Sequence, residues 1–294
     1  MTLFAVLFTA FSTVLFLTHT WGPGVHIQLT RRLLDRFRNA RRLLPDQEVV
    51  LHHPDAFLYG NIAADLINFK AFGGIKNHCH NWNIQERLEA HVESEGSRAF
   101  VLGYLCHLGA DIIAHNHFVP YHMVYNFPPR YLGHPYWEAI ADASVSDSEW
   151  HTIDQLKEDP AIHTFDVMVH KAVRMRVLGL RSNRWIFNNI LLINCRQNWR
   201  DFIRSVRKQA VRHPLDSDFL KLARDQSYVN MLSVFYKQRF AVLKALDPTG
   251  RQALRGARAL RHALMRDFGS RGSAQHTASI LAARAYGIVT HRGR

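Results

Sequence analysis

Two pairs of metal-binding side chains, each spaced by four residues, lie in the stretch 103–138. His107 is followed by Asp111, and His134 is followed by Glu138. Each residue of an α-helix turns by about 100°, so side chains four residues apart lie one turn apart on the same face. An imidazole and a carboxylate arranged in this way can bind one metal ion, and this mixture of ligands suits Zn²⁺. The spacing therefore predicts a hydrolytic site that holds more than one zinc ion.

The first pair lies in the most apolar helix that the pattern predicts, 97–114. A lone buried histidine is more often a hydrogen-bonded core residue than a ligand, but a buried aspartate is costly unless a cation neutralises it. A metal role for Asp111 is therefore favoured. Helical spacing alone favours His115 as the next ligand, with His117 as the alternative. His115 lies four residues after Asp111 on the same face, whereas His117 requires the helix to loosen before Pro120.

The second pair begins at His134, which precedes Pro135, a residue type that is favoured in the first turn of a helix. Glu138 would then lie one turn inside that helix. A His/Glu pair at this spacing is also an ordinary surface motif, so its position after the first pair is what favours a metal role.

Earlier segments offer further ligands. WGPGVH contains Trp21 and His26, FLYGNIAADLINF places Asp65 in an apolar run, and HCHNWN offers His78 and His80. Each has a plain structural interpretation as an aromatic anchor, a helix cap or an exposed loop. Their order ahead of the two later pairs is the feature that points to a shared site.

In this order the residues resemble the ligand series of the zinc-dependent phospholipase C family and its relatives, the S1/P1-type nucleases. That series is an N-terminal Trp, a His, an Asp, a His, then His-x3-Asp-x5-His and His-x3-Asp/Glu. The chain offers every element in order: Trp21, His26, Asp65, His80, His107, Asp111, His117, His134 and Glu138. The resemblance covers roughly residues 21–145. It implies an all-α, multi-helix bundle like phospholipase C and P1 nuclease, with two to three zinc ions per chain.

The resemblance also implies how the ligands are grouped. One zinc would be held by His80, His107, Asp65 and Asp111. A second, bridged by Asp111, would be completed by His26 and by the α-amine and carbonyl of Trp21. A third, more open zinc would be held by His117, His134 and Glu138. Asp65 would in addition be catalytic, because it can orient the attacking water. On this basis His117 is preferred to His115, and His80 to His78.

Some details divide between the two branches of this family. The Trp-Gly-x3-His start and the spacing from Trp21 to Asp65 and His80 are similar to the nucleases, whereas Glu138 in place of Asp is similar to the phospholipases. The GNIAADLI segment resembles a Gly-Asn-x-x-Pro-Asp element, although Ala64 stands where proline is common.

Helical periodicity dominates the chain and predicts an all-α protein. Besides 97–114, the apolar pattern favours helices over 26–44, 83–95, 162–178, 185–211, 215–246 and 251–268. The stretch 118–133 contains three prolines and is expected to be a turn-rich connection between the two metal pairs. Strand-like alternation is scarce.

Charge divides the 294 residues into two halves. Residues 1–150 carry 11 Lys and Arg against 14 Asp and Glu, whereas residues 151–294 carry 26 against 10. We expect residues 21–150 to form the zinc-binding catalytic core. Residues 151–294 would form a basic helical region that packs on this core or makes a subdomain.

The arginines of this basic region predict either solvated helix faces or contacts with an acidic membrane or nucleic acid. They recur at helical spacing at Arg196, Arg200, Arg204 and Arg207, and again at Arg251, Arg255, Arg258 and Arg261.

The first 20 residues contain no Lys, Arg, Asp or Glu. The apolar stretch Leu3–Leu17 has the length of a signal-peptide core rather than that of a full membrane span. We expect a cleaved signal peptide, with an uncleaved membrane anchor as the alternative. The protein would therefore be exported, to the periplasm or the medium, or anchored to a membrane. Only cleavage would release the α-amine of Trp21 for zinc.

The sequence thus predicts a zinc-dependent phosphodiester hydrolase that cleaves glycerophospholipids as a phospholipase C does. One alternative is an S1/P1-like zinc nuclease, whose substrate bases would stack on aromatic side chains. The other is a non-catalytic, zinc-stabilised, membrane-associated protein.

Overall fold

The computed structural model describes residues 21–66, 79–127, 133–172, 215–269 and 271–289. Every regular element within these ranges is helical, which confirms the all-α prediction. The segment 1–20, the expected helix 185–211, His78 and the arginines of 196–207 lie outside the described residues. Among the described residues, no helix combines the length and the apolar character needed to cross a lipid bilayer.

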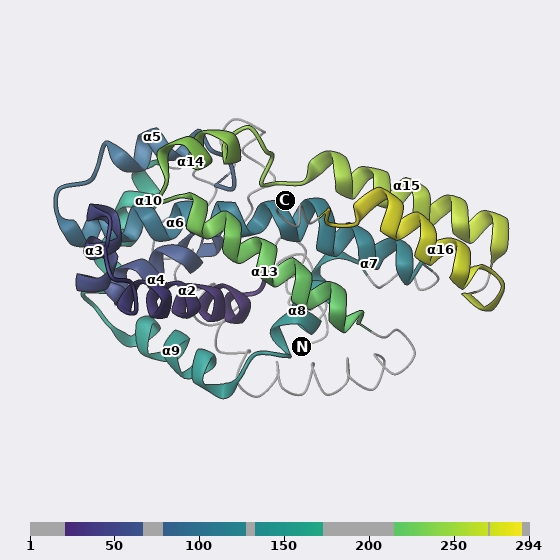
Figure 1. The fold of residues 1–294 in the computed structure, drawn as a ribbon, viewed down its shortest axis with the longest axis horizontal. Coiled ribbons are helices and arrows are strands. Elements are labelled where there is room, and N and C mark those ends of the chain that lie inside the picture. The colour runs from purple at the N-terminus through teal and green to yellow at the C-terminus, as the bar shows by residue number, and fades with distance from the viewer. Residues whose placement is uncertain (1–20, 67–78, 128–132, 173–214, 270, 290–294) are drawn as a thin grey trace, which may run out of the picture.

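Helix α6 (Glu95–Ile113) lies at the centre of the fold (Figure 1). Ser94 caps it by accepting a hydrogen bond from the Ser97 amide, and nearly all of its residues after the first turn are buried. A helix that is apolar on every side must be covered on every side. Helix α4 (Pro54–Ala63) packs along one side of α6 and α13 (Ser217–Ser233) packs along another.

Two glycines allow α4 and α6 to approach closely. A Cβ atom at Gly60 would lie 2.0 Å from the Phe100 carbonyl oxygen, and one at Gly103 would lie 2.2 Å from the Phe57 carbonyl oxygen. Both distances are far inside van der Waals contact, so only glycine fits at these positions. The close crossing brings Asn61 of α4 against His107 of α6.

The expectation of a turn-rich connection after residue 118 is wrong for its first part. Helix α6 continues through a π-helical turn (Ala114–Phe118) directly into α7 (Val119–Tyr125), with Pro120 in the first turn of α7. A proline lacks the amide hydrogen and clashes with the carbonyl four residues earlier. The wider π turn accommodates both effects, because it interrupts the regular i to i−4 hydrogen bonds.

Shorter helices surround this axis. They are α2 (Pro23–Arg38), α3 (Pro45–His52), the 3-10 turn η1 (Ala64–Leu66), α5 (Ile84–Glu89), α8 (His134–Asp142), α9 (Asp147–Glu158), η5 (Ile162–Phe165) and α10 (Asp166–Ala172). The helix expected over 26–44 starts and ends earlier. Pro23 lies in the first turn of α2, and Pro45 begins α3 instead of ending α2. Proline is favoured at helix starts, so both were start signals.

Residues 215–289 contribute four of the described helices. Helix α13 is followed by α14 (Lys237–Leu243), so the single helix expected over 215–246 is broken at 234–236. Helix α15 (Arg251–Phe268) has the predicted bounds, and α16 (Arg271–Tyr286) pairs with it as a hairpin. Both α15 and α16 pack on α7, and in Figure 1 the hairpin reaches the end of the molecule opposite α3.

Candidate metal centre

Four side chains converge in the core between η1, the segment before α5, and α6. His107 Nε2 lies 3.0 Å from Asp111 Oδ2 and 2.9 Å from His80 Nε2. His80 Nε2 lies 3.3 Å from Asp65 Oδ1 and 3.3 Å from Asp111 Oδ2. All four residues are at most 2% exposed. The spacing that predicted a shared face for His107 and Asp111 is therefore confirmed, and His80 and Asp65 join them from elsewhere in the chain.

His26 adds a third imidazole on the opposite side of Asp111. Its Nε2 lies 3.3 Å from Asp111 Oδ1, the carboxylate oxygen that does not face His80 and His107. Both oxygens of Asp111 are thus directed at imidazole nitrogens. This is the arrangement that a carboxylate needs in order to bridge two metal ions. The His26 ring also stacks on that of His107, with the ring centroids 4.1 Å apart.

The other ring nitrogen of each histidine is held by the surrounding structure. Asn61 orients two of them, since its side-chain oxygen lies 2.9 Å from His26 Nδ1 and its carbonyl oxygen lies 2.7 Å from His107 Nδ1. His80 Nδ1 lies 3.2 Å from Cys79 Sγ, and the Tyr104 hydroxyl donates to the Cys79 carbonyl at 2.7 Å, which fixes that residue. Contacts of this kind at Nδ1 fix the tautomer and leave Nε2 directed at the metal.

Burial and charge together favour a cation here. Burial and the neighbouring His107 lower the pKa of His26, which keeps it neutral, the form that binds metals. Burial alone would raise the pKa of Asp111, but the surrounding imidazoles, His107 first, hold it well below its usual range. Two carboxylates among neutral imidazoles would leave buried negative charge. Divalent cations would neutralise that charge, so the donor set fits zinc.

A second cluster lies where the π-helical turn Ala114–Phe118 (η4) meets α8. His134 Nε2 lies 2.5 Å from Glu138 Oε1, and His115 Nε2 lies 3.9 Å from the same oxygen. The ligand atoms of these three residues all lie within 4.8 Å of one another. The His134 side chain is 15% exposed, whereas the ligands of the first cluster are buried. This cluster is therefore the one that solvent can reach.

The structure differs from the family-based ligand order at one position of this second cluster. It brings His115 and not His117 to His134 and Glu138. The His117 ring turns toward α16, where its Nδ1 lies 3.1 Å from the Tyr286 carbonyl oxygen. The reason is that the helix continues past Ile113, so the residue four positions after Asp111 stays on the metal-facing side. Helical spacing favoured His115 on the same ground.

Trp21 lies beside the centre without directing its side chain at it. The indole nitrogen donates to Ser227 Oγ at 3.1 Å, and the ring packs on Phe118. The start of α2 is held by Asp142 at the end of α8. Its carboxylate accepts from the amides of Gly24 at 3.2 Å and Val25 at 2.9 Å. Burial raises the pKa of Asp142 to about 7.

Asn61 and Asp142 are the supporting residues that the sequence analysis did not single out. Asn61 stands four residues before Asp65 in the GNIAAD segment, and Asp142 stands four residues after Glu138. In both cases a polar residue one helical turn from a candidate ligand was the available signal.

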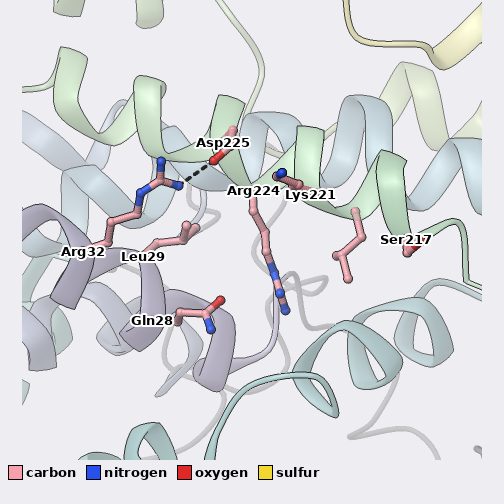
Figure 2. Close-up of a pocket in the computed structure, with 8 residues that line it drawn as sticks. Gln28, Leu29, Arg32, Ser217, Lys221, Arg224 and Asp225 are labelled. Carbon is pink, nitrogen blue, oxygen red and sulfur yellow. Dashed lines mark hydrogen bonds and ion pairs between the residues drawn. The ribbon is translucent and has the colours of Figure 1, made fainter.

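A separate cavity of about 280 Å³ lies between α2 and α13 (Figure 2). Arg32 and Asp225 form an ion pair of 2.6 Å at its edge. None of the candidate metal ligands lines this cavity, so it is not the metal centre. Its lining comprises Gln28, Leu29, Arg32, Ser217, Leu220, Lys221, Arg224 and Asp225.

A sequence profile described as zinc dependent phospholipase C matches residues 25–179. The matched region contains eight of the nine residues in the predicted ligand series, from His26 to Glu138, and also His115. No curated protein and no solved structure matches the chain.

Proposed function

The chain belongs to the zinc-dependent phospholipase C family, and from this premise we propose which of its residues bind zinc and how they act. The family makes it a zinc-dependent phosphoric diester hydrolase whose substrate is a phospholipid. The nuclease alternative is not favoured by the match. The ligand assignment, the number of zinc ions and the compartment are our own proposals.

We assign the first zinc to Asp65, His80, His107 and Asp111. The support is the convergence of their donor atoms within about one hydrogen-bond length in a fully buried site. The second zinc would share Asp111, take His26 through Nε2, and be completed by backbone atoms of Trp21. The third would be held by His115, His134 and Glu138, which replaces our earlier preference for His117.

When bound, zinc supplies a Lewis acid for the phosphoryl oxygens and lowers the pKa of water to near neutrality. The protein's own residues supply positioning. Asp111 would be shared by the first two ions, because imidazole nitrogens of both sites face its carboxylate. Asp65 would accept a hydrogen bond from the attacking water and so orient it toward phosphorus. Because His134 is partly exposed, a phosphate group would be able to reach an ion bound by His115, His134 and Glu138.

The observation that carries this assignment is the buried carboxylate of Asp111, flanked by three imidazole nitrogens at 3.0–3.3 Å. The test is metal analysis together with hydrolysis of a soluble short-chain phosphatidylcholine and, in parallel, single-stranded DNA. We expect about two to three zinc ions per chain. We also expect phosphocholine to be released from the lipid and the DNA to remain uncleaved. Asp65→Asn should abolish hydrolysis, whereas Asp225→Asn, in an exposed ion pair, should not. Protein that purifies without zinc, in the absence of chelators, would refute the assignment.

We also propose that the protein is exported and that the segment 1–20 is removed. The support is the uncharged, apolar character of that segment and the need for a free α-amine at Trp21. Intact-mass measurement of the mature protein tests this. Fully metallated, active protein that still carries residues 1–20 would contradict the role of Trp21.

A further inference from the structure

The α15–α16 hairpin carries an unbalanced positive charge. Residues 251–286 contain seven arginines and one acidic residue, Asp267. The stripe predicted from the sequence needs one correction. Arg261 is buried and donates through Nε to the Phe127 carbonyl oxygen at 2.9 Å, so it belongs to the packing of the hairpin. The exposed positions are instead Arg255, Arg258, His262 and Arg266, which we call the basic face of α15. They recur every three or four residues and thus share one side of the helix.

The two unpaired arginines of this face differ from two of the arginines on α2. Arg32 and Arg38 on α2 are paired with Asp225 and Asp35 at 2.6 and 2.8 Å. Arg266 is paired with the neighbouring Asp267 at 2.7 Å, whereas neither Arg255 nor Arg258 has an acidic side chain of the described residues within ion-pair distance. Like charges that are not neutralised within the protein repel one another. A surface that keeps them is suited to an anionic partner.

The exposed apolar residue at the end of α15 is not part of this face. Phe268, the last residue, is 40% exposed, but by helical spacing it lies on the side of α15 that carries the buried Leu254, Ala257 and Leu264. The basic face itself is therefore purely polar, and its contacts with a partner would be electrostatic.

The base of the hairpin contacts the second cluster of the metal centre. His115 Nδ1 lies 2.6 Å from the carbonyl oxygen of Pro248, in the loop before α15. Asn116 donates to the Asp247 carbonyl at 2.7 Å in the same loop. At the end of α16, the second helix of the hairpin, the Tyr286 carbonyl oxygen lies 3.1 Å from His117 Nδ1. The basic face therefore extends directly from the elements that hold the solvent-accessible cluster.

We propose that the basic face of α15 binds the surface of a bilayer that contains acidic phospholipids. The inference rests on the proposed function, because a phospholipase must meet its substrate in a lipid surface. Arginine side chains would contact the anionic head groups. Since the hairpin begins beside His115, binding would bring the accessible cluster to the same surface.

The test is co-sedimentation of zinc-loaded protein with phosphatidylcholine vesicles, with and without phosphatidylserine, over a range of salt concentrations. The test variant is Arg255→Gln/Arg258→Gln, which removes the two unpaired arginines. The control is Arg41→Gln/Arg42→Gln, which removes the same charge from exposed positions just after the end of α2. Each basic residue near an acidic bilayer strengthens binding about fivefold. We therefore expect the test variant to bind acidic vesicles on the order of 25-fold more weakly at low salt, and the control to bind as the wild type does.

Added salt should reduce the difference, because the screening length falls to about 8 Å at physiological ionic strength. Equal binding by the two variants would overturn the proposal. So would wild-type protein that binds equally well to vesicles with and without phosphatidylserine. Binding to DNA but not to vesicles would overturn it in favour of a nucleic-acid contact. Hydrolysis of soluble short-chain phosphatidylcholine, measured on the same samples, should be unchanged in both variants. That readout distinguishes the failure of docking from the failure of the proposed catalytic function.

Discussion

His122 provides a quantitative test of the packing between α7 and α13. Its Nδ1 donates to the Phe118 carbonyl at 2.9 Å, and its Nε2 accepts from the Asp216 amide at 3.2 Å. The ring is buried against Trp137 and Phe219. Only the neutral imidazole can make both hydrogen bonds, because the charged ring has no acceptor. Burial lowers the pKa of His122 from 6.5 to about 4.

The sign of the effect follows from proton binding. Between pH 6.5 and pH 4 the unfolded chain holds a proton on this residue and the folded protein does not. Stability must therefore fall as the pH decreases through this window, and the loss is complete below about pH 4. Each pKa unit corresponds to about 1.4 kcal/mol, so the total loss is about 3 kcal/mol. Above pH 6.5 this residue contributes no pH dependence.

The assay is urea unfolding of the wild type and of His122→Phe at a series of pH values from 8 to 4. Phenylalanine suits the aromatic surroundings but cannot bind a proton. At pH 8 the variant should be less stable by about 1 kcal/mol, because the Asp216 amide loses its acceptor. The gap should then shrink and reverse as the pH falls, because only the wild type must release a proton from this residue when it folds. Protonation of the metal-ligand histidines affects both proteins and cancels in the difference. Parallel stability curves for the two proteins would refute the reasoning.

Three further predictions concern the metal centre. Asp111→Asn should lose more zinc than Glu138→Gln in metal analysis, because Asp111 would serve two ions; equal losses would contradict a bridging role. His115→Gln should reduce zinc content and hydrolysis of soluble phospholipid, whereas His117→Gln should leave both close to wild type; the opposite result would restore the family order. Gly103→Ala should destabilise by about 1–3 kcal/mol or more in thermal unfolding and lower zinc content, since its Cβ would meet the Phe57 carbonyl at 2.2 Å and push Asn61 away. Gly96→Ala is its control, with 3.6 Å to the nearest atom, and it should not destabilise.

Local spacing predicted the parts of the centre that lie within one helix. His107 and Asp111 on α6, and His134 and Glu138 on α8, are each one helical turn apart, and both pairs lie where the spacing placed them. The bounds of α15 were predicted equally well, since Gly250 and Gly269 mark its two ends. In these cases the helical periodicity and the flanking glycines were sufficient to predict the positions of the residues.

Features that depend on contacts between distant segments could not be predicted in this way. The choice between His115 and His117 depends on whether the chain stays helical up to Pro120, and the π turn that allows this has no clear sequence signal. The burial of Arg261 depends on the position of the Phe127 carbonyl, which is 134 residues away in sequence. A charge pattern alone therefore assigned Arg261 to the surface.

Helix α8 connects the two clusters of the metal centre. Glu138 belongs to the accessible cluster, and one turn later Asp142 holds the amides of Gly24 and Val25 at the start of α2. His26 follows immediately on α2 and completes the buried cluster through Asp111. Gly22 is part of the same contact, because a Cβ atom there would lie 2.1 Å from the Asp142 carboxylate. The helix that carries Glu138 thus also holds the start of α2, and with it His26, so that a change at Asp142 should affect both clusters.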